Sequence, residues 1–228
     1  MPILQDHFYH RTIRTYTAVF GSVFNEITIL RKDGTKILIP ISYQIKQKYD
    51  VRNKQNSDPN VYRNLMNLPR MAFKLTDMQK DTTRITNRFN RILDSSIDVT
   101  TANSLNVQYN RVPYNFQYEL AIKTKTVDDL LQIYEQIVVF FNPSIRVNIL
   151  DNPDVNGTTS VTIKLLNQSI EDMFDGSFEG DQAIEATLNF ELEGWLYMPA
   201  STTGIIKTIN INYYDLDTKI KIDSDVIT

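Results

Sequence analysis

The clearest feature of the chain is a change of hydrophobic period between residues 114 and 149. Apolar residues first alternate with polar ones, which is typical of a strand with one buried face; the apolar positions are Tyr114, Phe116, Tyr118, Leu120 and Ile122. After Thr126, which has the residue type of an N-cap and is followed three residues later by Asp129, the spacing becomes helical. Pro143 cannot continue a helix, and alternation returns in residues 145–149. The sequence therefore predicts a strand, a helix and a second strand.

The N-terminal region predicts a helix followed by a hairpin. Residues 8–27 carry apolar side chains at steps of three or four, in spite of Gly21, and this spacing predicts an amphipathic helix. Asp33-Gly34 then separates two alternating segments, around Ile29 and from Ile37 to Ile41, which predicts a β-hairpin. A mainly polar stretch over 46–67 indicates a long exposed loop.

Most of the remaining chain predicts strands. Alternating segments occur around Met71–Leu75, Leu105–Tyr109, Val161–Leu165 and Ile184–Leu192, and the last of these is expected to turn Glu185, Thr187, Asn189, Glu191 and Glu193 outward. Pro113 is expected at an edge or a bulge. Strands that are grouped together, with about two long helices, favour an α+β fold with a mainly antiparallel β-sheet. We expect one domain over 1–211, and a C-terminal arm or strand extension over 212–228, where Ile alternates with Lys and Asp.

Composition narrows the classes of partner. The 228 residues are 42% hydrophobic, which is enough for a substantial core, and the formal net charge of −3 gives no overall basic field for nucleic acid. The absence of cysteine excludes disulfides and thiolate chemistry and fits a reducing cytoplasm. No uncharged apolar run approaches the roughly 18 residues of a membrane span. We therefore expect a soluble protein without membrane association or specific nucleic-acid binding.

The sequence does not predict an active site, a cofactor site or a metal site. His7 and His10 are expected to be surface residues, and no phosphate-binding or dinucleotide-binding glycine motif occurs. The acidic residues between 171 and 185 do not have the spacing of a calcium-binding loop and favour a solvated loop or a docking surface. Glu191 and Glu193 suit a wet sheet face better than a glycosidase pair. Trp195 and Tyr197 are expected to serve packing more than ligand stacking.

Several residues are candidates for interaction with other proteins. Arg84, Arg88 and Arg91 are expected on one face of a helical segment, where they could meet phosphate or an acidic protein surface, or simply face solvent. The other candidates lie in the exposed loops 46–60 and 151–158 and in the C-terminal arm; they are Asn53, Lys54, Asn56, Asp154, Asn156, Ile220 and Ile222.

The order of several short segments resembles the tail sheath stabiliser and completion proteins of T4-like contractile-tailed bacteriophages. These segments lie within about residues 8 to 209, and none is specific alone. They are Phe8-Tyr9 with Arg14 and Tyr16, Phe24-Asn25, Ile39-Pro40-Ile41-Ser42-Tyr43, Gln108-Tyr109-Asn110 to Tyr118-Glu119-Leu120, Asp128-Asp129, Glu135-Gln136-Ile137, and Gly194-Trp195-Leu196-Tyr197 with Pro199.

The resemblance implies a tail-terminator-like fold and a structural role in the virion. It implies a homo-hexameric ring at the head-proximal end of the tail, at the tail–neck junction, assembled in the host cytoplasm. The implied partners are the tail sheath protein, the tail tube or tube terminator protein and the neck proteins, and such a ring would leave a path for genomic DNA. No catalytic residue, cofactor or metal is implied.

Two alternatives share parts of this pattern. Another neck or tube-capping virion component would have a similar composition and an equal lack of catalytic motifs. A carbohydrate-binding tail module would need Trp195, Tyr197 or the pair Glu191 and Glu193 to be exposed in a cleft.

Overall fold

The computed structural model describes residues 7–43, 68–87, 89–93, 104–152, 157–173, 183–204, 206, 208–214 and 221–227. These residues form two α-helices and four sheets. The helices are α1 (Thr12–Val23) and α4 (Val127–Val138). The strands before α4 are β1 (Thr28–Leu30), β2 (Lys36–Leu38), β3 (Ile41–Tyr43), β4 (Arg70–Lys80), β5 (Arg91–Leu93), β6 (Ser104–Tyr109) and β7 (Val112–Thr124). Those after it are β8 (Ser144–Asn152), β9 (Gly157–Met173), β10 (Ala183–Leu196), β11 (Ser201–Gly204), β12 (Ile209–Tyr214) and β13 (Lys221–Ile227).

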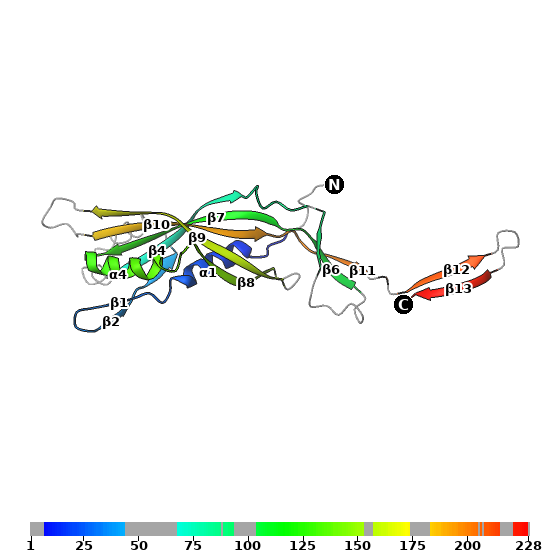
Figure 1. Ribbon diagram of the computed structural model, residues 1–228, viewed down its shortest axis with the longest axis horizontal. Coiled ribbons are helices and arrows are strands. Elements are labelled where there is room, and N and C mark those ends of the chain that lie inside the picture. The colour runs from blue at the N-terminus through cyan, green and yellow to red at the C-terminus, as the bar shows by residue number, and fades with distance from the viewer. Residues whose placement is uncertain are drawn as a thin grey trace.

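A six-stranded sheet in the order β3-β4-β7-β10-β9-β8 forms the body of the molecule (Figure 1). All its pairings are antiparallel except that of β3 with β4, so the sheet is mixed. The central ladder is long, because β7 pairs with β10 from Val112↔Leu196 to Thr124↔Ile184. The prediction of a mainly antiparallel sheet with two helices therefore holds for the described residues, whereas a tail-terminator-like fold stays a prediction.

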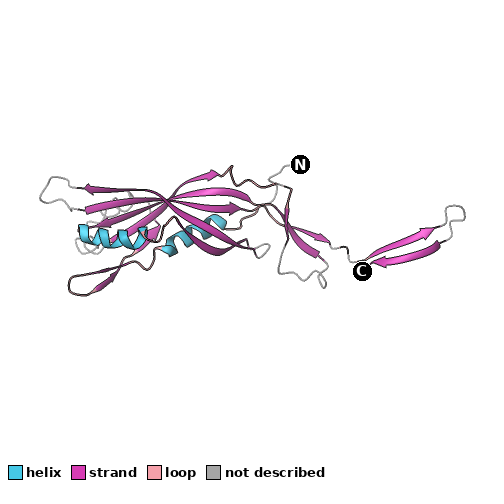
Figure 2. Cartoon of the chain, viewed as in Figure 1, coloured by secondary structure: helices cyan, strands magenta, loops and turns pink. Residues whose placement is uncertain are grey.

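Both helices cover one face of this sheet and share its hydrophobic core (Figure 2). Phe20 of α1 stacks on Tyr118 of β7 with the ring centroids 4.4 Å apart, and it meets Phe190 of β10 edge-on at 5.4 Å. The helix carries Gly21 where it crosses β4, because a Cβ there would lie 2.7 Å from Cζ of Phe73. Aromatic packing thus fixes the position of α1 on the sheet.

The strand–helix–strand prediction around α4 is confirmed. The inward positions of β7 alternate as expected, and the backbone N–H of Asp129 donates to Oγ1 of Thr126 at 3.3 Å, which caps the helix. β8 follows Pro143 and pairs with β9, with Val147 opposite Val161. Pro113 lies near the start of β7, beyond the last pair of β7 with β4, where a missing N–H is tolerated.

Three predictions about elements are wrong. The N-terminal helix is shorter than residues 8–27, since α1 covers only Thr12–Val23. The hairpin of β1 and β2 forms around Asp33-Gly34, but Ile41 belongs to β3 in the large sheet. Residues 81–87 are turns and irregular chain, and Arg91 starts strand β5, so Arg84 and Arg91 do not share a helical face.

Two smaller sheets extend the molecule at one end (Figure 1). A three-stranded sheet in the order β11-β6-β5 follows the body, and the hairpin of β12 and β13 lies beyond it. The predicted long loop 46–67 and the segment 153–156 lie outside the described residues. The division into 1–211 and 212–228 stays a prediction; within the described residues the hairpin begins at Ile209.

Candidate interaction surfaces

Trp195 lies where the body meets the three-stranded sheet, and it is held by contacts from several elements. The guanidinium carbon of Arg111 lies 4.1 Å from the centroid of the indole ring, and that of Arg84 lies 5.1 Å from it. Both distances allow a cation–π interaction. The hydroxyl of Tyr16 accepts from the backbone N–H of Trp195 and donates to its carbonyl, each at 2.9 Å. Helix α1 is thereby tied to the end of β10.

The two arginines are themselves positioned by polar contacts. Arg84 Nε donates to Oδ2 of Asp81 at 2.6 Å, and its second terminal nitrogen donates to Oδ1 of Asn115 at 2.7 Å. The hydrogen bonds from the Arg84 guanidinium and the Thr83 hydroxyl hold the pKa of Asp81 well below its usual range. Arg111 donates to Oγ1 of Thr159 on β9 at 3.1 Å.

A second polar network attaches the three-stranded sheet to the body. Gln108 of β6 is buried; its amide oxygen accepts from Asn152 of β8 at 2.6 Å, and its amide nitrogen donates to the carbonyl of Met198. Tyr197, which is only 7% exposed, shares a hydrogen bond of 3.0 Å with Thr159. Through Gln108, one face of the three-stranded sheet is turned toward the body.

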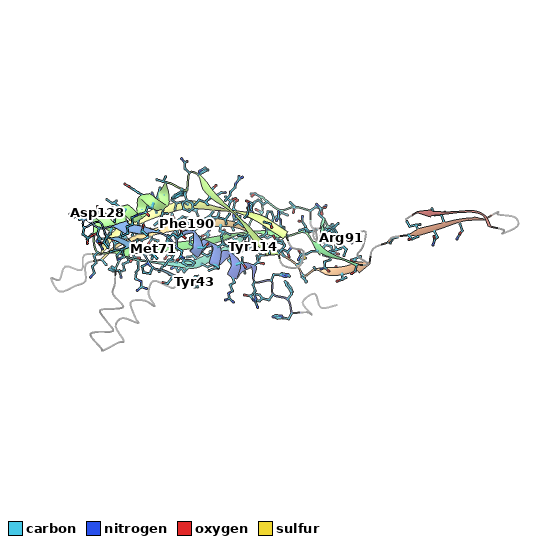
Figure 3. All side chains as sticks on the ribbon, turned by 90° about the horizontal axis from the view of Figure 1, so that it is seen from below. Tyr43, Met71, Arg91, Tyr114, Asp128 and Phe190 are labelled. Atoms are coloured by element: carbon cyan, nitrogen blue, oxygen red, sulfur yellow. The ribbon has the colours of Figure 1, made fainter. Side chains whose placement is uncertain are left out.

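The other face of the three-stranded sheet is open. We call it the outer face; it carries Arg91 and Leu93 of β5, Leu105, Val107 and Tyr109 of β6, and Ser201 and Thr203 of β11, which the register places opposite one another. Leu93 is 55% exposed and Tyr109 is 47% exposed. A hollow of about 90 Å³ on this face is lined by Arg91, Val107, Tyr109, Ser201 and Thr203. Figure 3 shows Arg91 toward the end of the molecule that carries the two smaller sheets, and Asp128 of α4 near the opposite end.

A larger apolar groove of about 440 Å³ lies between the C-terminal ends of α1 and α4. Its lining comes from both helices and from the start of β8, and includes Val23, Phe24, Ile137, Phe140 and Ile145. Phe140 is 70% exposed at its edge. This groove opens on a part of the body different from the outer face.

Helix α4 also covers an edge of strand β1. The side-chain amide of Gln132 accepts from the backbone N–H of Leu30 at 2.9 Å and donates to its carbonyl at 3.2 Å. Gln136 donates to the carbonyl of Thr28 at 2.8 Å. The buried carboxylate of Asp129 pairs with Arg31 at 2.8 Å. These bonds satisfy backbone groups that an open strand edge would expose.

The predicted interaction residues are distributed unevenly. Arg84 lies at the Trp195 junction and Arg91 lies on the outer face, so the structure separates two residues that were expected on one helix. Ile222 falls within β13, of which only the backbone pairing is described. The other predicted residues, Asn53, Lys54, Asn56, Arg88, Asp154, Asn156 and Ile220, lie outside the described residues.

Glu185 is buried, although alternation predicted it on the exposed face. It is 2% exposed. The register places Lys123 opposite it on β7, and Arg70 opposite Lys123 on β4, so two cationic positions follow it across the sheet. Buried charged side chains are usually paired with opposite charge, and this row places such charge beside Glu185. Sequence alternation alone could not reveal the burial of Glu185, because the row joins three strands that are neighbours in the sheet but distant in the sequence.

The residues considered for ligand binding are engaged within the protein. Tyr197 is buried, the ring of Trp195 has two guanidinium groups near it, and Glu193 forms an ion pair with Lys164. This arrangement disfavours a carbohydrate cleft built on them. In the part of the chain that the structure describes, no three acidic, histidine or cysteine side chains gather as a metal site would require. Among the same residues, no helix has the length and apolarity of a membrane span.

Sequence reasoning missed Arg111, Tyr109 and Gln132. For Arg111 and Tyr109 no local signal exists, because their partners are distant in the chain. For Gln132 the pairing with Gln136 one helical turn later was a usable signal, since side chains four residues apart share a helix face.

A comparison with protein families gives the class of the chain. Residues 7–228 match the family described as T4-like virus Myoviridae tail sheath stabiliser. The chain belongs to this family and is a structural component of a bacteriophage tail.

One curated relative supports the same assignment. The tail completion protein gp15 of Enterobacteria phage T4 is 31% identical over 218 residues, with 91% of this chain and 79% of the relative covered.

Proposed function

We propose that the protein is a tail terminator, which forms a hexameric ring on the head-proximal end of a contractile tail. The ring caps tube and sheath, stabilises the extended sheath and presents a surface to the neck proteins. The observation that carries this proposal is the family match over residues 7–228. The role requires no catalytic residue, cofactor or metal ion.

The architecture suits such a role. A rigid sheet body with a shared aromatic core can hold a fixed shape, while the outer face and the β12–β13 hairpin remain available for contacts. Rings arise when one surface of a subunit binds a different surface of its neighbour and the rotation closes. An elongated subunit with distinct surfaces at different places meets this requirement.

Sheath stabilisation follows from differential affinity. A ring that binds the last disc of the extended sheath, and does not bind the contracted one, shifts the equilibrium toward the extended state by the difference in binding free energy. Six linked contacts would act with avidity, because each bound subunit raises the effective concentration of the next. A modest free energy per subunit is then sufficient.

The first test is the mass and shape of the purified protein. Light scattering should give about 158 kDa for six copies of the 26.4 kDa chain, and negative-stain images should show rings. The protein should also lower the fraction of contracted particles when it is added to extended tails that lack it. A chain that stays monomeric alone and on extended tails would contradict the ring.

A further inference from the structure

Among the described residues, the β12–β13 hairpin has no third strand or helix packed on it. Its strands pair with each other from Ile209↔Ile227 to Tyr214↔Lys221, and neither packs extensively on any other described element. Figures 1 and 2 both show it beyond the three-stranded sheet. An isolated two-stranded hairpin is at best marginally stable in water and needs a further strand or layer. The hairpin is therefore expected to pack on another surface.

One face of the hairpin combines apolar and acidic positions. The register sets Ile209, Ile211 and Tyr213 opposite Ile227, Asp225 and Asp223 respectively. Residues that lie opposite one another in an antiparallel pair occupy the same face. This face thus brings four apolar or aromatic positions together with two aspartates.

The outer face of the three-stranded sheet has the complementary chemistry. It exposes Leu93 and Tyr109, and Arg91 makes no ion pair or side-chain hydrogen bond with the described residues. Arg91 also lines the hollow of about 90 Å³, together with the hydroxyl-bearing Tyr109, Ser201 and Thr203. The Ser201 hydroxyl donates to the carbonyl of Val107 at 3.3 Å, whereas the guanidinium of Arg91 with the hydroxyls of Tyr109 and Thr203 makes a good donor set for a carboxylate. The outer face can therefore receive an apolar surface that carries an aspartate.

We propose that the β12–β13 hairpin of one copy packs on the outer face of a second copy. Only four residues join Gly204 of β11 to Ile209, and the hairpin continues away from the three-stranded sheet (Figure 1). The hairpin therefore does not lie on the outer face of its own chain, and the occupant of that face is a hairpin from another copy. The two surfaces are different, so the contact is head-to-tail and can repeat around a closed ring. This inference rests on the proposed ring and names the surfaces that join its subunits.

Cysteine cross-linking tests the contact directly, because the natural chain contains no cysteine. One preparation carries Ile211→Cys in the hairpin and another carries Tyr109→Cys on the outer face. When the two are mixed under assembling conditions, a short bis-maleimide should produce a covalent dimer that neither preparation gives alone. The matched control pairs Ile211→Cys with Lys32→Cys, an exposed position in the β1–β2 turn, and should give no dimer.

A charge exchange tests the ionic part of the contact. Arg91→Glu and Asp225→Lys should each weaken assembly by about tenfold or more, since each sets like charges against each other. The double variant should recover at least part of the loss, as expected for residues in contact. Lys32→Glu, a charge reversal in the β1–β2 turn, should assemble as the natural protein does.

The two levels of the proposal fail in different ways. Rings that form without the mixed cross-link, or that survive deletion of residues 209–228, would overturn the hairpin contact and leave the ring intact. A natural protein that assembles neither alone nor on extended tails would overturn the ring and the contact together. A cross-linked dimer from a single Ile211→Cys preparation would show hairpins meeting each other and would also overturn the proposed contact.

Discussion

The burial of Tyr118 makes the stability of the protein depend on pH in the alkaline range. Its ring stacks on Phe20, its hydroxyl shares a hydrogen bond of 3.1 Å with Thr17, and burial raises its pKa from 10.0 to about 12 although that hydrogen bond opposes the shift. The folded protein thus holds the Tyr118 proton to higher pH than the unfolded chain. The stability that this group contributes is complete below pH 10 and is lost as the pH rises toward about 12.

We therefore expect the stability margin between the natural protein and Tyr118→Phe to shrink at high pH. Between about pH 9 and about pH 11 the natural protein should lose about 1 kcal/mol that the variant does not lose, measured by urea unfolding. Ile137→Val is the control, because it alters the core without removing a titrating group. If the difference in unfolding free energy between the natural protein and Tyr118→Phe stayed constant with pH, the phenol of Tyr118 would not be desolvated.

Gly194 is a position where the core leaves no room for a side chain. A Cβ there would lie 2.6 Å from Cε2 of Tyr16 and 2.8 Å from Cε2 of Phe116, and both rings are fully buried. Gly194→Ala should therefore lower the free energy of unfolding by about 1–3 kcal/mol, as overpacking does. Gly204→Ala is the matched control, since nothing lies within 4 Å of its added Cβ. Equal effects of the two changes in urea unfolding would contradict this explanation.

At the scale of elements, α4 stabilises the β1–β2 hairpin by bonding its edge. Removing the side-chain amide in Gln132→Ala leaves the N–H and carbonyl of Leu30 without their partner. Hydrogen exchange at the Leu30 amide should become faster, by the equivalent of about 1 kcal/mol in opening free energy. Glu135→Ala changes an exposed residue of the same helix and should leave this exchange rate unchanged. Unaltered protection at Leu30 in Gln132→Ala would mean that the edge is protected by other contacts.

The sequence predicted those elements whose determinants are close together in the chain. β7, α4 and β8 were found because alternation, the Thr126 cap and Pro143 follow one another within a short segment. β3 could not be found, because its parallel pairing with β4 joins segments separated by a long connection. The position of Arg84 beside Trp195 depends on residues more than a hundred positions apart. The spacing of arginines and apolar residues predicted a helix there, and a turn built on Asp81 forms instead.

The family was predicted from segment order, whereas the interaction surfaces were not. The match over residues 7–228 confirms the resemblance. The outer face is assembled from β5, β6 and β11, which no local pattern brings together. Of the predicted site residues, Arg91 alone falls on that face among those that the structure describes. The residue type of Arg91 made it a candidate for interaction, but its place on the outer face depends on the strand register, which the sequence does not show.

At the scale of the whole molecule, the Trp195 junction helps to hold the three-stranded sheet against the body. Arg111 lies between β6 and β7, and it ties this connection to the body because it contacts the indole ring on β10 and donates to Thr159 of β9. A cation–π contact and a hydrogen bond each contribute on the order of 1 kcal/mol. Loss of both should allow the three-stranded sheet to move while the aromatic core of the body stays folded.

Arg111→Ala should therefore make Trp195 more accessible without unfolding the body. The chain has a single tryptophan, so its emission reports this junction directly; we expect a red shift and stronger quenching by acrylamide, with little change in far-ultraviolet circular dichroism. Arg111→Lys should be intermediate, because it keeps the charge but loses the planar guanidinium. Arg14→Ala, an exposed change on α1, is the control. If the orientation of the outer face matters for the ring, the Arg111→Ala protein should also assemble more weakly than the Arg14→Ala protein. Unchanged emission would show that the backbone alone holds the junction.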